Sequence, residues 1–212
     1  MEKEIIIGRD GNQPFTIKKE MNGVSREHAK ITITDNGNWY LEDLGSSNGT
    51  FIRDEKTGEL IPANDKIRIS PMTFIFLGPD NSRGCCFFAK QAVSYGDFTE
   101  EYEFLNTKED EFDEKLDNLE NLISREKKFI FLINVLVAIV SLIPQIDSDL
   151  RMNLLRIVPV VSTGFAAFYD ASGKKDTIKE MREKFHHCPN PLCSHKLKTS
   201  EIRNYKCSKC KK

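Results

Sequence analysis

The sequence has 212 residues and lacks several features that would assign a function directly. It contains no nucleophile motif, no glycine-rich phosphate loop and no metal site with an open position, so we predict that the protein is not an enzyme. The formal net charge is −1, which gives no overall basic field to attract nucleic acid. Residues 1–4 (MEKE) are charged and do not form a secretory signal. We therefore expect an intracellular protein with reduced thiols.

Residues 4–95 consist of short β-type runs separated by Gly, Asn, Asp and Pro. Apolar and polar residues alternate in 29–34 and in 39–41, which is the period of a strand with one buried face. Asn-Gly pairs at 36–37 and 48–49 indicate turns, because both residue types tolerate positive φ. Many short strands with frequent turns predict an antiparallel β-sandwich.

Three short motifs lie at the ends of strand-like runs in this region: Gly8-Arg9 after one run, residues 25–28 (SREH) before another, and residues 46–50 (SSNGT) after a third. A phosphate ester carries nearly two negative charges and three acceptor oxygens, so its binding site needs a fixed cation and short donors. The motifs provide guanidinium groups, hydroxyl donors and an amide suited to gripping a peptide backbone. Arg9 and Arg26 provide the guanidinium groups, Ser25 and Ser47 provide the hydroxyl donors, and Asn48 provides the amide.

The runs 24–29 (VSREHA) and 43–51 (DLGSSNGTF) resemble the two signature loops of the forkhead-associated (FHA) domain. The resemblance covers about residues 4–90 and implies an eleven-stranded sandwich that binds phosphothreonine peptides, in preference to phosphoserine, through loops at one end. It further implies that Arg9, Ser25, Arg26 and Ser47 hold the phosphate, that Asn48 holds the peptide main chain, and that Gly8, His28, Gly49 and Thr50 shape the loops. We expect micromolar affinity, near −8 kcal/mol. The alternative is a sandwich that has lost ligand binding and serves as a scaffold.

Residues 98–128 are acidic and contain few turn residues, which predicts a helix. Its apolar residues recur at spacings of four, three and four, and they are Phe112, Leu116, Leu119 and Ile123. This spacing places them on one helical stripe that docks on the rest of the protein. A short coiled coil that forms a homo-oligomer is the alternative, although Glu109 and Glu126 interrupt its seam.

Residues 129–146 contain no charge, and as a helix they would extend about 27 Å, just short of a bilayer core. A second apolar run follows at 152–169, with Arg156 inside it. We predict a two-helix membrane hairpin at 129–171, and a pair of buried soluble helices is the alternative. Lys and Arg flank the hairpin on both sides, whereas the connecting loop contains only Arg151. The positive-inside rule then places both termini in the cytoplasm.

Four cysteines near the end form two pairs, Cys188 with Cys193 and Cys207 with Cys210, separated by 13 residues. Two such knuckles joined by a short hairpin resemble a zinc ribbon, in which four thiolates form a closed structural zinc site. Disulfides are the poorer alternative in a cytosolic tail. His186, His187 or His195 is an alternative ligand, and the spacing does not separate zinc from iron. Lysines make this segment basic, which we interpret as a solvated face.

These observations predict a multidomain protein with an all-β FHA sandwich at 1–96, an acidic helical linker at 97–128, a membrane hairpin at 129–171, a charged helix at 172–186 and a zinc ribbon at 187–212. The expected function is that of a membrane-tethered adaptor that recruits phosphothreonine-bearing partners. A first alternative is a two-helix membrane effector that forms pores under control of the sandwich. A second is a soluble interaction protein that acts through the sandwich and the zinc ribbon.

Overall fold

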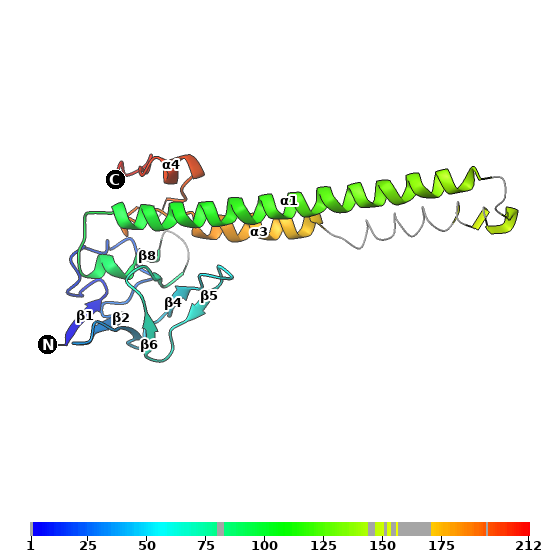
Figure 1. Cartoon of the computed structure of the whole chain (residues 1–212). Helices are drawn as coiled ribbons and strands as arrows, with labels where there is room; N and C mark the ends of the chain where they lie inside the picture. Colours follow the sequence, from blue (N-terminus) through cyan, green and yellow to red (C-terminus); the bar gives the residue numbers. More distant parts are fainter. Residues whose placement is uncertain are drawn as a thin grey trace. The chain divides into compact units, whose positions relative to one another are not determined.

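The protein folds into two compact units (Figure 1). This computed structural model describes residues 2–79, 83–143, 147–150, 152–153, 156, 171–193 and 195–212. The first unit combines Met1–Asp110 with Met181–Lys212, and the second is Glu111–Glu180. The two ends of the chain therefore belong to one folded body, and the second unit is inserted between them.

Eight strands are described in the first unit, and they form two four-stranded antiparallel sheets. The first sheet has the order β1-β2-β3-β6, with strands Lys3–Ile7, Ala29–Ile33, Trp39–Asp43 and Ile67–Ile69. The second has the order β5-β4-β7-β8, with strands Leu60–Pro62, Thr50–Arg53, Phe74–Leu77 and Cys85–Phe88. A 3₁₀ turn, η1 (Ala89–Ala92), follows β8 and leads toward helix α1.

The sandwich predicted from the alternating strands is confirmed, because alternate strand residues form one apolar core. Ile7, Ile31, Leu41 and Ile75 are completely buried in it. The described residues contain fewer strands than the eleven that the resemblance implied. Part of the difference lies in the long connection between β1 and β2, where Phe15 is buried but the backbone forms no sheet ladder. Polar side chains such as Gln13, which donates to Gly8 O at 2.8 Å, close its turns instead.

Strand β7 is buried on both of its faces. Its residues Ile75 and Leu77 belong to the sandwich core, whereas Phe74 and Phe76 lie on the opposite face. That outer face is covered by the C-terminal segment: the His187 ring lies 5.7 Å, centroid to centroid, from the rings of both Phe74 and Phe76. The cysteine-containing segment is therefore part of the sandwich unit rather than a separate tail.

A buried ion cluster joins helix α1 (Thr99–Ser141) to the end of helix α3 (Ala171–Phe185). Glu109 is 2% exposed and accepts hydrogen bonds from both Arg182 and His186, with His186 Nε2 at 2.7 Å. Burial alone would raise the pKa of Glu109, but the hydrogen bonds from His186 and Arg182 outweigh it and lower this pKa to about 2. A residue that seemed to interrupt a coiled-coil seam thus contacts the chain's own C-terminal part.

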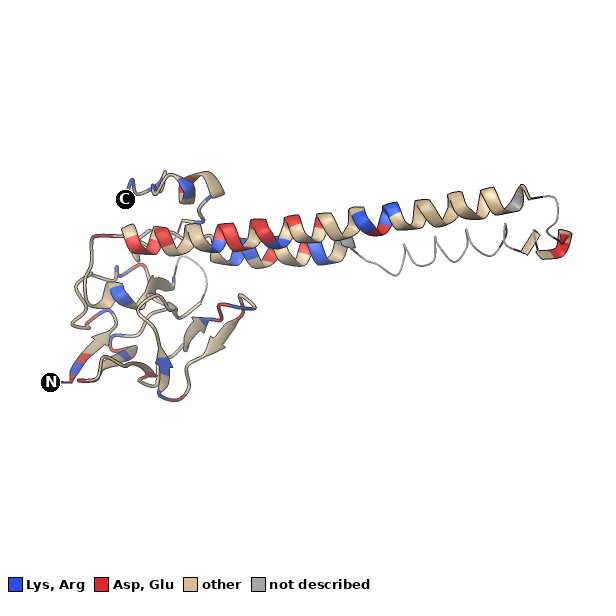
Figure 2. Cartoon of the chain, in the orientation of Figure 1, with Lys and Arg blue, Asp and Glu red and all other residues tan. Residues whose placement is uncertain are grey.

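Helix α1 continues without a break from the acidic segment into the apolar one. Figure 2 shows that charged residues occupy most of α1 but are absent from its far end. The predicted stripe is its most covered side in the second unit: Phe112 is 4% exposed, and Leu116, Leu119 and Ile123 are half-buried. Leu119 and Leu122 line an apolar groove together with Ile178 of α3, and Lys175 pairs with Glu120 beside it. The described contacts of this stripe are therefore within the chain.

Among the described residues, no helix is both long and apolar enough to cross a membrane. The apolar end of α1 is described from Phe129 to Ser141, about 20 Å of helix. Most of the second predicted hairpin run, 152–169, lies outside the described residues. The membrane hairpin and its boundaries therefore stay predictions.

Candidate functional site

The five residues predicted to bind ligand all line one cleft of about 560 Å³ at an end of the sandwich. The cleft is formed by the loops after β1, before β2 and between β3 and β4. Its lining consists of Arg9, Asp10, Asn22, Gly23, Val24, Ser25, Arg26, Glu27, Ser47 and Asn48. Residues that are far apart in the sequence are thus brought to one surface by strand ends.

Backbone hydrogen bonds hold Arg9 beside the second motif. Arg9 N donates to Ser25 O at 3.1 Å, and Asp10 N donates to Arg26 O at 2.9 Å. Gly8 permits this approach, because a Cβ atom there would lie 2.0 Å from Arg26 O. The two guanidinium-bearing residues are consequently on neighbouring backbone segments, where both side chains remain exposed.

His28 connects the second and third motifs from inside the protein. Its side chain is completely buried; Nδ1 accepts from Ser25 N at 2.8 Å, and Nε2 lies 3.0 Å from Gly49 O. Since Nδ1 accepts, Nε2 carries the proton and donates to the carbonyl. Burial lowers the pKa of His28, so the neutral ring is the stable form. His28 shapes the loops and does not line the cleft.

Asp43 organises the third motif, a role that the sequence analysis missed. Its carboxylate accepts from Ser46 N and Ser46 Oγ, both at 2.7 Å, and from the Thr50 hydroxyl. Ser46 Oγ in turn accepts from Gly49 N at 3.0 Å. Burial alone would raise the pKa of Asp43, but the hydrogen bonds from Thr50 and Ser46 outweigh it and hold this pKa below its usual range. The only sequence signal was the place of Asp43 at the start of the 43–51 run.

Ser25, Ser47 and Asn48 link the second and third motifs at the cleft surface. Ser47 N donates to Ser25 Oγ at 3.2 Å, and Asn48 Nδ2 donates to Gly23 O at 2.9 Å. Part of the Asn48 amide is therefore used within the protein. Its Oδ1 has no hydrogen bond among the described residues and is oriented by the bond of its partner nitrogen. This oxygen is an acceptor suited to a peptide N–H.

The cleft contains charged side chains of both signs. Arg9 and Arg26 contribute two guanidinium groups, and Asp10 and Glu27 contribute two carboxylates. In the part of the chain that the structure describes, none of these four side chains forms an ion pair. Two unpaired guanidiniums beside serine hydroxyls form a site for a dianionic group with several acceptor oxygens.

The FHA domain family matches residues 5–70, a stretch that contains every residue of the cleft. The chain carries an FHA domain. FHA domains recognise phosphopeptides, and the cleft lies within the matched residues. No curated protein matches this chain significantly.

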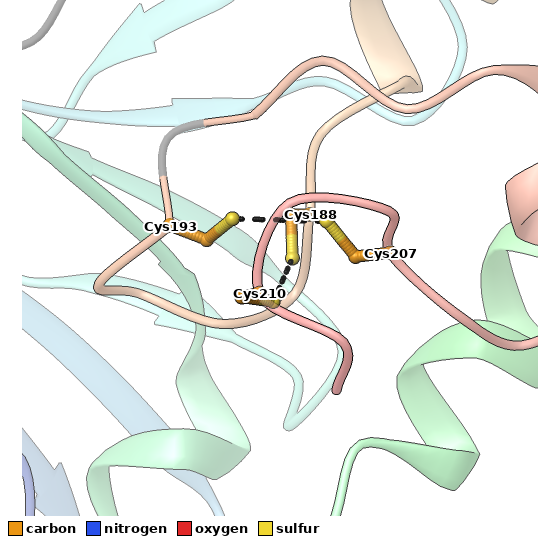
Figure 3. Close-up of side chains that lie close together, drawn as sticks. All are labelled: Cys188, Cys193, Cys207 and Cys210. Carbon is orange, nitrogen blue, oxygen red and sulfur yellow. Dashed lines mark hydrogen bonds between the residues drawn. The ribbon is translucent and has the colours of Figure 1, made fainter.

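The four predicted metal ligands also come together, and they lie in the same unit as the FHA domain. Their sulfur atoms lie within 4.8 Å of one another and point toward a common centre (Figure 3). Cys188 and Cys210 Sγ are 3.6 Å apart, and Cys193 and Cys207 Sγ are 3.7 Å apart. A tetrahedral zinc ion with Zn–S bonds of about 2.3 Å needs sulfur separations of about 3.8 Å. The cluster can therefore hold a metal ion such as zinc.

The nearby histidines have other contacts. His186 binds Glu109, and His187 packs on Phe76. His195 Nε2 lies 3.4 Å from Glu201 Oε1, and both residues lie close to Cys207, so these three form a second group of candidate ligands. The Glu201 oxygens, however, already accept from Lys198 N and Ser208 N, both at 2.7 Å. The four cysteines are consequently the simpler ligand set.

The two cysteine pairs are connected differently from the predicted hairpin. In the described part of this segment, the backbone forms a single isolated β-bridge, between His187 and Lys196, and not the ladder of a hairpin. The short helix α4 (Thr199–Arg203) follows, and its Arg203 donates to Asn106 and Asp110 of α1 at 2.7 and 2.6 Å. The cysteine cluster is thus fastened to α1 as well as to β7.

Proposed function

We propose that the protein is an adaptor that binds phosphothreonine-containing proteins through the cleft of its FHA domain. One observation carries this proposal: Arg9, Arg26, Ser25 and Ser47 line a single cleft in which neither guanidinium has an ion-pair partner among the described residues. The guanidiniums and hydroxyls would hold the phosphate, and Asn48 would hold the peptide main chain. Each charge-assisted hydrogen bond contributes about 1.5–3 kcal/mol.

The test is binding of the full chain to a phosphothreonine peptide library, with unphosphorylated and phosphoserine peptides as controls. The full chain is required because truncation after the sandwich would expose Phe74 and Phe76. Arg9→Ala is expected to weaken binding at least tenfold, about 1.4 kcal/mol or more. The matched control is Arg68→Ala, an exposed arginine of β6 that binds Asn38 and does not line the cleft. Equal affinity of the Arg9 and Arg68 variants would contradict the proposed site.

We propose zinc as the structural metal of the cysteine cluster, on the basis of the sulfur separations. Its chemistry there would be to hold four thiolates together, and the full ligand set leaves no position for a substrate. Burial raises the pKa of Cys188, so without a bound cation this residue would stay a neutral thiol. Metal analysis of the purified chain should give one zinc ion per chain, and Cys207→Ser should lower this content. Iron in place of zinc would contradict the assignment.

Membrane attachment through 129–171 is a further part of the proposal. It is supported by the exposed apolar residues at the end of α1, among them Phe129, Phe131 and Leu136, which are 60–67% exposed. Arg125, Lys127 and Lys128 precede them (Figure 2). The test is flotation of the full chain with liposomes, followed by carbonate extraction. Recovery of the chain in the lipid-free fraction would favour an adaptor that does not attach to membranes.

A further inference from the structure

The cysteine cluster contacts the sandwich where β8 begins. The Cys85 thiol donates to Pro191 O at 3.5 Å, and Tyr95 OH donates to Asn190 Oδ1 at 3.2 Å. Asn190 and Pro191 lie between the ligands Cys188 and Cys193, and Asn190 is 6% exposed. The first metal knuckle, residues 188–193, therefore contacts the sandwich through the loop between its two cysteines.

The same end of β8 is joined to the phosphopeptide cleft. Two residues before Cys85, Arg83 O accepts from Gly23 N at 2.9 Å. Gly23 O in turn accepts from Asn48 Nδ2 at 2.9 Å. Gly23 also packs closely on this backbone, because a Cβ atom there would lie 2.8 Å from Arg83 O. A continuous series of contacts thus extends from the metal knuckle through β8 to a cleft residue.

Metal loss would disturb the start of this series. A segment of this size that holds four buried thiols has little core of its own, and metal binding supplies much of the free energy that folds such segments. Without the ion, the loop that contains Asn190 and Pro191 would lose the metal bonds of Cys188 and Cys193 on either side of it. The Cys85 thiol, which is 3% exposed, then loses its partner, and the outer face of β7 loses the cover of His187.

We propose that the protein is a metal-responsive phosphopeptide receptor, in which metal occupancy of the cysteine cluster stabilises the binding-competent position of Gly23 and Asn48. This inference rests on the proposed phosphopeptide function. Coupling between two sites is reciprocal, so the phosphopeptide must also tighten metal binding by the same factor. The physical element that both sites bias is the segment from Arg83 to Cys85.

The experiment compares the full chain loaded with Zn²⁺ and the same chain after chelation. Two quantities are measured: affinity for a phosphothreonine peptide pool with randomised flanks, and residue-resolved amide hydrogen exchange. We expect zinc removal to weaken peptide binding at least about fivefold, the lower end of typical coupling. We expect faster exchange at Gly23 N–H and unchanged exchange at Thr34 N–H, which donates to Asn38 O at 2.9 Å outside this series.

Cys85→Ala tests the path itself. This variant should still bind zinc and peptide, but the ratio of peptide affinities with and without zinc should approach one. Arg203→Ala is the control, because it removes a different contact of the cysteine segment, the hydrogen bonds from Arg203 Nη1 to Asn106 and Asp110 at 2.7 and 2.6 Å. It should keep the wild-type ratio. In the wild-type chain, the peptide should raise the affinity for zinc by the same factor by which zinc raises the affinity for the peptide.

Equal peptide affinity in the two metal states of the wild-type chain, with unchanged exchange at Gly23, would overturn the coupling. Equal loss of protection at Gly23 and Thr34 would also overturn it, because the metal would then hold the whole sandwich together. If neither metal state binds any phosphopeptide, the proposed function fails. Exchange at Gly23 still decides the coupling in that case, since it needs no ligand.

Discussion

Replacing Glu109 by Gln should destabilise the protein through one buried contact. The carboxylate is 2% exposed and receives hydrogen bonds from Arg182 and His186. These hydrogen bonds lower its pKa from 4.5 to about 2, and at 1.36 kcal/mol per unit this corresponds to about 3 kcal/mol of folding free energy at neutral pH. Removal of one partner from a buried ion pair typically costs about 3–5 kcal/mol, because the other charge is left without compensation.

The assay is thermal unfolding of the full chain followed by the fluorescence of Trp39, the single tryptophan, which packs against the sandwich core. For a body of this size we expect the melting temperature to fall by about 6–12 °C. Glu120→Gln is the matched control: the same substitution in the same helix, at an exposed carboxylate that pairs with Lys175. It should have no resolvable effect.

The pH dependence of the Glu109 contact has a definite sign. Because the folded-state pKa is lowered, the contribution is complete above the unfolded value of 4.5 and is lost as pH falls toward about 2. The difference in stability between wild type and Glu109→Gln should therefore shrink across this acidic range. Equal stability of the two proteins at neutral pH, or a constant difference down to pH 2, would refute the reasoning.

Two further predictions concern the loops of the cleft. Burial lowers the pKa of His28 in the folded state, so its contribution to stability is complete above the unfolded value of 6.5 and is lost as pH falls through the folded pKa. His28→Gln should therefore flatten this part of a curve of stability against pH. An unchanged curve would contradict the role of burial. Asp43→Asn should weaken phosphopeptide binding by about tenfold, because the amide nitrogen cannot accept hydrogen bonds from Ser46 or Thr50. Unchanged affinity would show that the loop does not need the hydrogen bonds to Asp43.

Several features of the protein could be predicted from the sequence because they depend on local patterns. Strand alternation gave the sandwich, and the stripe that begins at Phe112 gave the covered side of α1. The three motifs identified residues of the cleft, since each lies at a strand end and strand ends of a sandwich converge. The two cysteine pairs gave the metal cluster, because ligand spacing is itself a local property.

Other features depended on tertiary contacts between residues that are distant in the sequence. Glu109 is 73 residues from Arg182, and only the fold shows that its charge is buried and paired. Strand β7 lies within the predicted sandwich, but its outer face is covered by a segment more than 100 residues away. The sequence by itself therefore determined the local folding pattern and which residues line the cleft. The tertiary structure decided that the cysteine cluster and the FHA domain form one body, because hydrogen bonds and packing across such separations leave no periodic pattern along the chain.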